Sequence, residues 1–243
     1  MVSVAIITGA ASGIGAATTQ ELRQAGWMVI GADLAFTDSN EANDGAGFDA
    51  RLDVTSSDGW DALVSAIVQR FGKIDLLVNC AAYLRDSSLI DLDPADLRRH
   101  FEVNVTGTFL GMQAAARAMI ERRSGIIVNI SSVSGSMAHA GRGAYAASKW
   151  ATRGLSQTAA LEWAAHGIRV CTVIPGPIDT PMSRAARGYD PSIPLGDLDL
   201  PQVPLRRFGQ ASEVAGLIAY LSSPAAAYIT GSEFVIDGGF LLT

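Results

Sequence analysis

The chain has 243 residues, 49% of them hydrophobic, and a net charge of −6 from 18 basic and 24 acidic side chains. This length and apolar content can bury one substantial core, so we expect a single domain over residues 1–243. The acidic balance disfavours nucleic acid and anionic membranes as partners; no apolar run reaches the roughly 18 residues of a membrane span, and no basic flank or cleavage-like site marks a signal peptide.

Short apolar runs alternate along the chain with longer helix-like segments. We expect strands at 2–8, 27–33, 49–53, 74–79, 125–131, 168–174 and 233–237, and helices at 13–25, 56–71, 94–122, 143–166 and 211–221. Nearly uninterrupted β-branched runs are typical of parallel strands that are covered on both faces. The pattern therefore predicts an α/β fold of the Rossmann type, with a doubly wound parallel sheet of about seven strands in three α/β/α layers.

A glycine-rich loop, TGAASGIG at residues 8–15, joins the first expected strand to the first expected helix. Gly9, Gly13 and Gly15 lack a Cβ, so backbone amides there can approach a pyrophosphate at the positive end of the helix. The spacing is G-x-x-x-G-x-G rather than the common G-x-G-x-x-G, and a tight turn without a ligand is the alternative. The loop is a candidate dinucleotide site.

An acidic side chain, Asp33, ends the second expected strand. A carboxylate at that place can bind the 2′- and 3′-hydroxyls of an adenosine ribose. It would repel a 2′-phosphate by ~4 kcal/mol per unit charge at 4 Å and an effective dielectric constant of 20. Neither 10–13 nor 34–37 contains a cation, so the sequence predicts NAD rather than NADP as the cofactor.

Two further elements contain or precede polar residues that could belong to a site. Ser131 and Ser132 come after the strand expected at 125–131, at the carboxyl edge where ligands of parallel sheets gather, and a hydroxyl there can orient a substrate oxygen. The alternative is a pair of loop serines that satisfy their own backbone. Asn104 lies within an expected helix although asparagine is a mediocre helix former, which is consistent with a helix kink or a held water.

Tyr145 and Lys149 stand four residues apart on an expected helix, so their side chains project from one face and can share one site. A tyrosine whose pKa is ~10 needs a shift of about three units, or ~4 kcal/mol, to act as a base near neutral pH. One ammonium at about 4 Å supplies ~4 kcal/mol at an effective dielectric constant of 20. The pair is therefore a candidate for proton transfer, in which Lys149 lowers the pKa of Tyr145.

As a set, these motifs resemble the short-chain dehydrogenase/reductase family over essentially the whole chain. Residues 8–15 resemble its cofactor loop, Asn104 its helix-kink asparagine, and Ser132, Tyr145 and Lys149 its catalytic residues. Residues 175–180 resemble its nicotinamide-side turn, and 237–239 its C-terminal signature. The resemblance implies these cofactor-binding residues: Gly9, Ser12, Gly13, Ile14, Gly15, Asp33, Asp53, Val54, Asn79, Ala81, Tyr145, Lys149, Pro175, Gly176, Ile178 and Thr180.

The resemblance also implies a mechanism. Hydride passes between the nicotinamide and a carbinol carbon while Tyr145 exchanges the hydroxyl proton, Ser132 steadies the oxyanion, Lys149 binds the ribose, and Asn104 holds a relay water. A homotetramer is implied as well. No metal site is assigned.

One stretch departs from the family pattern, because Asn79-Cys80-Ala81-Ala82 replaces the usual Asn-Asn-Ala-Gly. We expect Ala82 to narrow the cofactor edge or to tune the substrate space. The only cysteines, Cys80 and Cys171, lie in apolar segments and are expected to be reduced thiols that fill the core of a cytoplasmic protein.

The residues expected beside the substrate are mostly apolar: Tyr83, Leu84, Ser132, Ser134, Met137, His139, Tyr145, Pro177, Met182 and Tyr189. Pro, Gly and Asp recur through 181–205, which predicts a mobile loop over the site. We expect a secondary alcohol or ketone on a hydrophobic or cyclic skeleton, such as a steroid, a terpenoid or an aryl alcohol. A sugar or polyol dehydrogenase, a 3-oxoacyl carrier-protein reductase and a non-catalytic NAD sensor are the alternatives.

Overall fold

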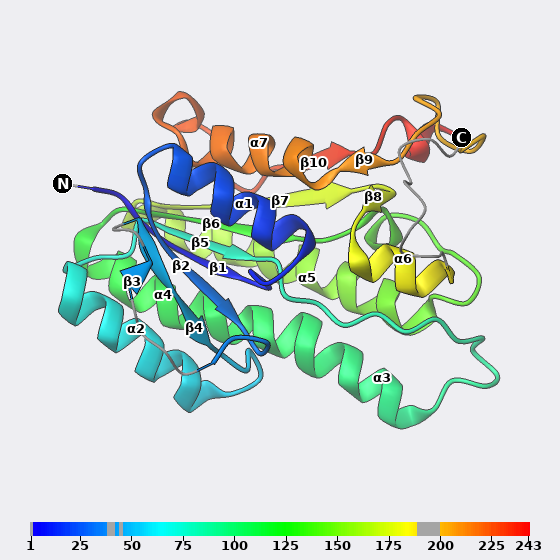
Figure 1. The fold of residues 1–243 in the computed structure, drawn as a ribbon, viewed down its shortest axis with the longest axis horizontal. Coiled ribbons are helices and arrows are strands. Elements are labelled where there is room, and N and C mark those ends of the chain that lie inside the picture. Colours follow the sequence, from blue (N-terminus) through cyan, green and yellow to red (C-terminus); the bar gives the residue numbers. More distant parts are fainter. Residues whose placement is uncertain (1, 38–41, 44–45, 189–199) are drawn as a thin grey trace.

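The computed structural model describes residues 2–37, 42–43, 46–188 and 200–243 (Figure 1). Seven strands form a parallel sheet in the order β10-β7-β6-β5-β1-β2-β4, and the two-residue β3 adds to β4 as an antiparallel edge. The strands of this sheet are β1 (Val4–Thr8), β2 (Met28–Asp33), β3 (Ala42–Asn43), β4 (Gly47–Arg51), β5 (Leu76–Asn79), β6 (Gly125–Ile130), β7 (Ile168–Pro175) and β10 (Glu233–Ile236). The predicted doubly wound parallel sheet is confirmed.

Helices cover both faces of the sheet, as Figure 1 shows. On one face α1 and α7 pack on each other and on a core that includes Leu22 and Ile218. On the other face α2, α4 and α5 enclose a second core that contains the fully buried Trp60. The helices are α1 (Gly13–Gln24), α2 (Ser57–Phe71), α3 (Pro94–Phe101), α4 (Thr108–Arg122), α5 (Gly143–Trp163), α6 (Pro181–Arg187) and α7 (Ala211–Ser222).

The strand order reverses between β1 and β5. From β1 the chain builds outward through β2 and β4, then returns to place β5 on the opposite side of β1 and continues through β6, β7 and β10. In open parallel sheets, ligands bind outside the carboxyl ends of the strands at such a reversal. The loops that follow β1, β2, β5, β6 and β7 therefore meet at one edge of the sheet.

The helix predicted at 94–122 is not continuous. A π-helical segment, Glu102–Gly107, separates α3 from α4 and contains Asn104. The side chain of Asn104 bonds both backbone groups of Tyr83, and the hydroxyl of Thr152 on α5 donates to its carbonyl at 3.2 Å. These tertiary bonds compete with the regular helical pattern, which is a common cause of such bulges near functional sites.

The loop predicted over 181–205 begins instead with a helix, α6. Thr180 caps it through its hydroxyl, which accepts from the amide of Ser183, and Pro181 occupies the first turn, where its missing N–H costs nothing. Residues 189–199 lie outside the described residues, and in the described end of the predicted loop, 200–205, Leu200 and Val203 are buried. Within the part of the chain that the structure describes, no helix has the length and apolarity needed to cross a bilayer.

Candidate active site

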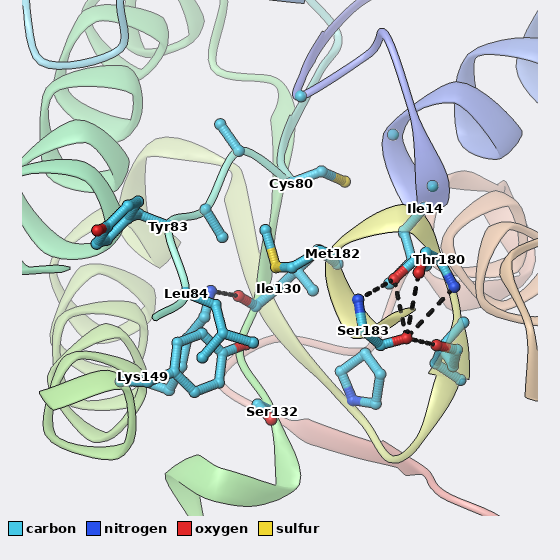
Figure 2. Close-up of a pocket in the computed structure, with 18 of the residues that line it drawn as sticks. Ile14, Cys80, Tyr83, Leu84, Ile130, Ser132, Lys149, Thr180, Met182 and Ser183 are labelled. Carbon is cyan, nitrogen blue, oxygen red and sulfur yellow. Dashed lines mark hydrogen bonds between the residues drawn. The ribbon is translucent and has the colours of Figure 1, made fainter. Parts of the chain in front are cut away.

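A cavity of about 610 Å³ opens at the edge where the strand order reverses. Most of the residues predicted to bind cofactor or substrate line it: Gly9, Ser12, Gly13, Ile14, Gly15, Asp33, Asp53, Val54, Ala81, Tyr83, Leu84, Ser132, His139, Tyr145, Lys149, Pro175, Gly176, Pro177, Ile178, Thr180 and Met182. Figure 2 shows Ser132 and Lys149 on one side of this space and Thr180 and Ser183 on the other. Segments far apart in the sequence thus meet at one site.

The glycine loop lines the cavity with three residues that have no side chain, Gly9, Gly13 and Gly15. Gly9 has a φ of +66°, and a Cβ there would lie 2.9 Å from the amide nitrogen of Ala81. A Cβ on Gly15 would lie 2.2 Å from the carbonyl oxygen of Gly9. Ser12 precedes α1 in an extended conformation, and its side chain does not cap the helix. A tightly packed loop with three glycines, at the start of a 12-residue helix, fits a pyrophosphate.

Asp33 occupies the neighbouring part of the cavity. Its carboxylate accepts from the amides of Ala11 at 3.1 Å and Ala35 at 2.9 Å, which fixes its orientation. The strand register pairs Asp33 with Arg51, and Nη1 of Arg51 donates to the carbonyl of Leu34 at 2.6 Å. The two loops named from the sequence, 10–13 and 34–37, contain no cation, but the strand register brings Arg51 of β4 beside Asp33.

The hydroxyls of Ser131 and Ser132 have different partners. Ser131 Oγ donates to the carbonyl of Lys149 at 3.0 Å and so ties β6 to α5. Ser132 lies on the cavity wall, and its side chain hydrogen-bonds that of Tyr145, which favours the charged form of the tyrosine. Of the two serines, Ser132 is the one placed beside the candidate proton donor.

Tyr145 is only 8% exposed, and burial raises its pKa because the phenolate loses its hydration. The hydrogen bond from Ser132 and the charge of Arg142 act in the opposite direction. The nitrogen of Lys149 lies 5.7 Å from the centre of the Tyr145 ring. The expected net lowering of the tyrosine pKa by Lys149 is wrong for this structure, because burial outweighs the neighbouring charges.

Lys149 is buried, and its Nζ donates to the carbonyl of Ile130 at 2.8 Å. Burial lowers its pKa to about 8, because the ammonium is removed from water without a carboxylate partner. Tyr145 and Lys149 both lie on α5 and both line the cavity, as their spacing predicts.

Four predicted site residues do not line the cavity: Asn79, Asn104, Ser134 and Met137. Asn79 is buried behind the wall, where its Nδ2 donates to Oδ1 of Asn129 at 2.8 Å. Asn104 is fully buried and donates to Oγ of Ser148 at 2.9 Å. Asn79 therefore links β5 to β6, and Asn104 links the π-helical segment to α5. A fifth predicted residue, Tyr189, lies outside the described residues.

Comparison with known proteins agrees with this geometry. A family model described as enoyl-(acyl carrier protein) reductase matches residues 9–241. A solved short-chain type dehydrogenase/reductase from Mycobacterium marinum is 33% identical and aligns with a TM-score of 0.88 over 99% of this chain and 96% of that one. The chain belongs to the short-chain dehydrogenase/reductase family. It is therefore an oxidoreductase of the alcohol–ketone type that uses a nicotinamide cofactor.

Individual family members differ in substrate. A trans-4-hydroxycyclohexanecarboxylate dehydrogenase of Sinomonas cyclohexanicum is 39% identical, covering 97% of this chain and 92% of its own. A 3-oxoacyl-[acyl-carrier-protein] reductase of Thermotoga maritima is 38% identical, covering 98% of each. A 3-alpha-(or 20-beta)-hydroxysteroid dehydrogenase of Mycobacterium tuberculosis is 36% identical, covering 97% and 88%. The structure of ElxO with NADP bound is 28% identical, with a TM-score of 0.90 over 100% of both chains.

The stretch that departs from the family pattern lies on the cavity wall. The amides of Cys80 and Ala81 both donate to the hydroxyl of Thr8 at 3.1 Å, which ties the stretch to the end of β1. Cys80 is half-buried and lines the cavity, and burial raises the pKa of its thiol to about 12. Cys171 is a buried core residue as expected, whereas Cys80 is only partly buried and forms part of the cavity wall.

Sequence reasoning missed several residues of the short-chain dehydrogenase site. Arg99, Arg142, Gln202 and Phe240 line the cavity. Arg142 stands three residues before Tyr145, so its helix position was a usable signal. Gln202 lies within 181–205, the segment expected over the site, but it was not singled out, and no local pattern links Phe240 to the cavity.

Proposed function

We propose that the protein is an NAD-dependent dehydrogenase that interconverts a hydrophobic or cyclic secondary alcohol and its ketone. The observation that carries the proposal is one continuous cavity with Tyr145, Ser132 and Lys149 on its wall and Asp33 beside the glycine loop. This arrangement supports proton transfer in one part of the cavity and ribose recognition in another.

In the proposed reaction, a bound nicotinamide dinucleotide supplies the hydride acceptor or donor. The hydroxyls of Ser132 and Tyr145 bind the substrate oxygen, and Tyr145 gives or takes its proton. The raised pKa of Tyr145 keeps the phenol protonated at neutral pH, where it can donate to a ketone oxygen. Lys149 binds the ribose, and Asn104 positions the backbone of Tyr83 and the hydroxyl of Ser148 around α5.

Apolar side chains support the substrate class. Leu84, Val133, Pro177, Met182 and Phe240 all line the cavity. Figure 2 places Leu84 and Met182 around the space beside Lys149. Two of the relatives are named as dehydrogenases of a hydroxycyclohexanecarboxylate and of a hydroxysteroid, which is consistent with a cyclic substrate here.

The proposal predicts that Asp33→Ala lowers the dissociation constant of NADPH, relative to that of NADH, by roughly 10- to 100-fold. The reason is that removal of the carboxylate removes its repulsion of a 2′-phosphate. Quenching of protein fluorescence measures both constants without a substrate. Arg51→Ala, tested alone, should weaken NADPH binding by roughly two- to tenfold and leave NADH binding nearly unchanged, since exposed ion pairs contribute little.

In the double variant, Asp33→Ala with Arg51→Ala, the dissociation constant of NADPH relative to that of NADH should fall less than in Asp33→Ala alone. An unchanged ratio in Asp33→Ala would refute the assignment of cofactor choice to this carboxylate. Arg51 matters to the design because it is the cation in register with Asp33, and the structure of ElxO with NADP bound shows that a related chain of this fold accommodates NADP.

A second candidate is a 3-oxoacyl carrier-protein reductase, which the Thermotoga maritima relative favours by its identity over nearly the whole chain. It would prefer NADPH and a thioester substrate. The deciding experiment follows NADH formation from cyclic, steroid, terpenoid, aryl and sugar alcohols, and NAD(P)H consumption with a 3-oxoacyl thioester. Turnover of cyclic alcohols with NAD supports the main proposal. Turnover of the thioester alone, with NADPH, would replace it by the second candidate.

A further inference from the structure

Charge is unevenly distributed among the described residues that line the cavity. The acids, Asp33 and Asp53, lie at the ends of neighbouring strands beside the glycine loop. Arg99 belongs to the same region, because its charge lowers the pKa of Asp53. Lys149 already donates to a backbone carbonyl. Arg142 is the remaining arginine of the cavity, and it precedes Tyr145 by three residues at the start of α5.

The ion pair that holds Arg142 is loose. Its Nε lies 3.2 Å from Oδ1 of Asp86, and its Nη2 lies 3.3 Å from Oδ2. In Arg153–Glu233 the two corresponding contacts are 2.7 and 2.6 Å. A guanidinium has five N–H donors in a rigid fork. Asp86 therefore orients Arg142 through Nε and Nη2, while Nη1 has no hydrogen-bond partner among the residues that the structure describes.

The positive charge of this pair dominates at the reacting end of the cavity. Asp86 does not line the cavity, whereas Arg142 does. The pKa of Tyr145 is lowered more by Arg142 than it is raised by Asp86. An anion bound beside Tyr145 therefore meets a net attraction from the pair, in a partly apolar cavity that Leu84 and Phe240 also line, where charge-assisted hydrogen bonds are strong.

We propose that the substrate is an anionic alcohol, in which an apolar ring or chain carries a carboxylate in addition to the reacting carbinol, and that Arg142 binds this carboxylate. The inference deepens the proposed dehydrogenase function and rests on it. Arginine suits this role because its planar fork matches a carboxylate in two-pronged geometry, which a lysine does not reproduce. Asp86 acts as a positioning residue that holds the guanidinium toward the cavity.

The test compares a hydroxycyclohexanecarboxylate with its uncharged primary amide, which keeps the ring and nearly the same shape. In the wild type we expect kcat/KM for the carboxylate to exceed that for the amide by at least about tenfold, as a charged hydrogen bond would give. Arg142→Met should lower kcat/KM for the carboxylate by about 10- to 100-fold, mostly through KM, and change the amide less than about threefold. Arg142→Lys should recover only part of the loss.

Arg98→Met provides the matched control, because Arg98 is an exposed arginine of α3 that does not line the cavity. It should leave both substrates unchanged. NADH binding, measured by fluorescence, shows whether Arg142→Met remains folded. If that variant does not fold, the wild-type preference for the carboxylate over the amide still decides the question.

Two outcomes overturn the inference while the proposed function stands: equal kcat/KM for carboxylate and amide in the wild type, or equal losses for both substrates in Arg142→Met. Failure of every alcohol to reduce NAD would instead overturn the proposed function. A preference for a phosphorylated or sulfated alcohol over the carboxylate would also reject the carboxylate assignment, even if it depended on Arg142.

Discussion

Tyr145→Phe should lower kcat for alcohol oxidation by about 10²- to 10⁴-fold, the usual contribution of a positioned general acid or base. The substitution removes only the hydroxyl, so the ring keeps its edge contact with His100 and its place near Lys149. The dissociation constant of NADH, measured by fluorescence quenching, should change less than about twofold. The loss therefore falls on the chemical step.

A matched control separates this effect from tyrosine loss in general. Tyr228→Phe changes a fully exposed tyrosine far from the cavity lining, and it should leave kcat and KM unchanged. Ser132→Ala should lower kcat in the same direction as Tyr145→Phe, because both hydroxyls bind the same oxygen. Activity of Tyr145→Phe close to that of the wild type would reject the assignment of proton transfer to this residue.

Lys149→Met should abolish most activity and also change how stability depends on pH. In the folded protein burial lowers the pKa of Lys149 from 10.5 to about 8. The unfolded chain then binds more protons between about pH 8 and 10.5, so the free energy of unfolding of the wild type rises with pH across that window. Relative to Lys149→Met, the wild type should gain about 3 kcal/mol between pH 7 and 10.5.

Urea unfolding of the two proteins at a series of pH values measures this difference directly. Other titrating groups are shared by both proteins and cancel in the comparison. The lost hydrogen bond to Ile130 does not cancel, but it adds an offset rather than the expected rise with pH. A difference in unfolding free energy that stays constant from pH 7 to 10.5 would show that Lys149 is not a desolvated ammonium in the folded state.

Much of the site follows from local patterns. Tyr145 and Lys149 share one helix, so a spacing of four residues is enough to place both on one face. The glycine loop and Asp33 follow successive strands, and parallel strands present their carboxyl ends at one edge. For these residues the sequence-based expectation and the structure agree.

Other expectations failed where partners come from distant parts of the chain. Asn79 was expected on the cofactor wall, but its amide bonds Asn129 on the next strand of the sheet. A kink or a held water was expected at Asn104 within 94–122, but neither the π-helical form of the segment nor the bonds of Asn104 to Tyr83 and Thr152 was expected. Residue type marked Asn104 as unusual within a helix, but helical periodicity does not identify its tertiary partners.

The sequence by itself determined the parallel α/β fold, the glycine loop and the order of the residues proposed to handle proton and ribose, because these depend on strand alternation and on the helical repeat within one element. Only the tertiary structure placed Arg51 beside Asp33 and Asp86 beside Arg142, since strand register and loop packing decide both. It also reversed the expected direction of the Tyr145 pKa. Charge spacing can be read along one helix, but desolvation depends on everything that packs around the side chain.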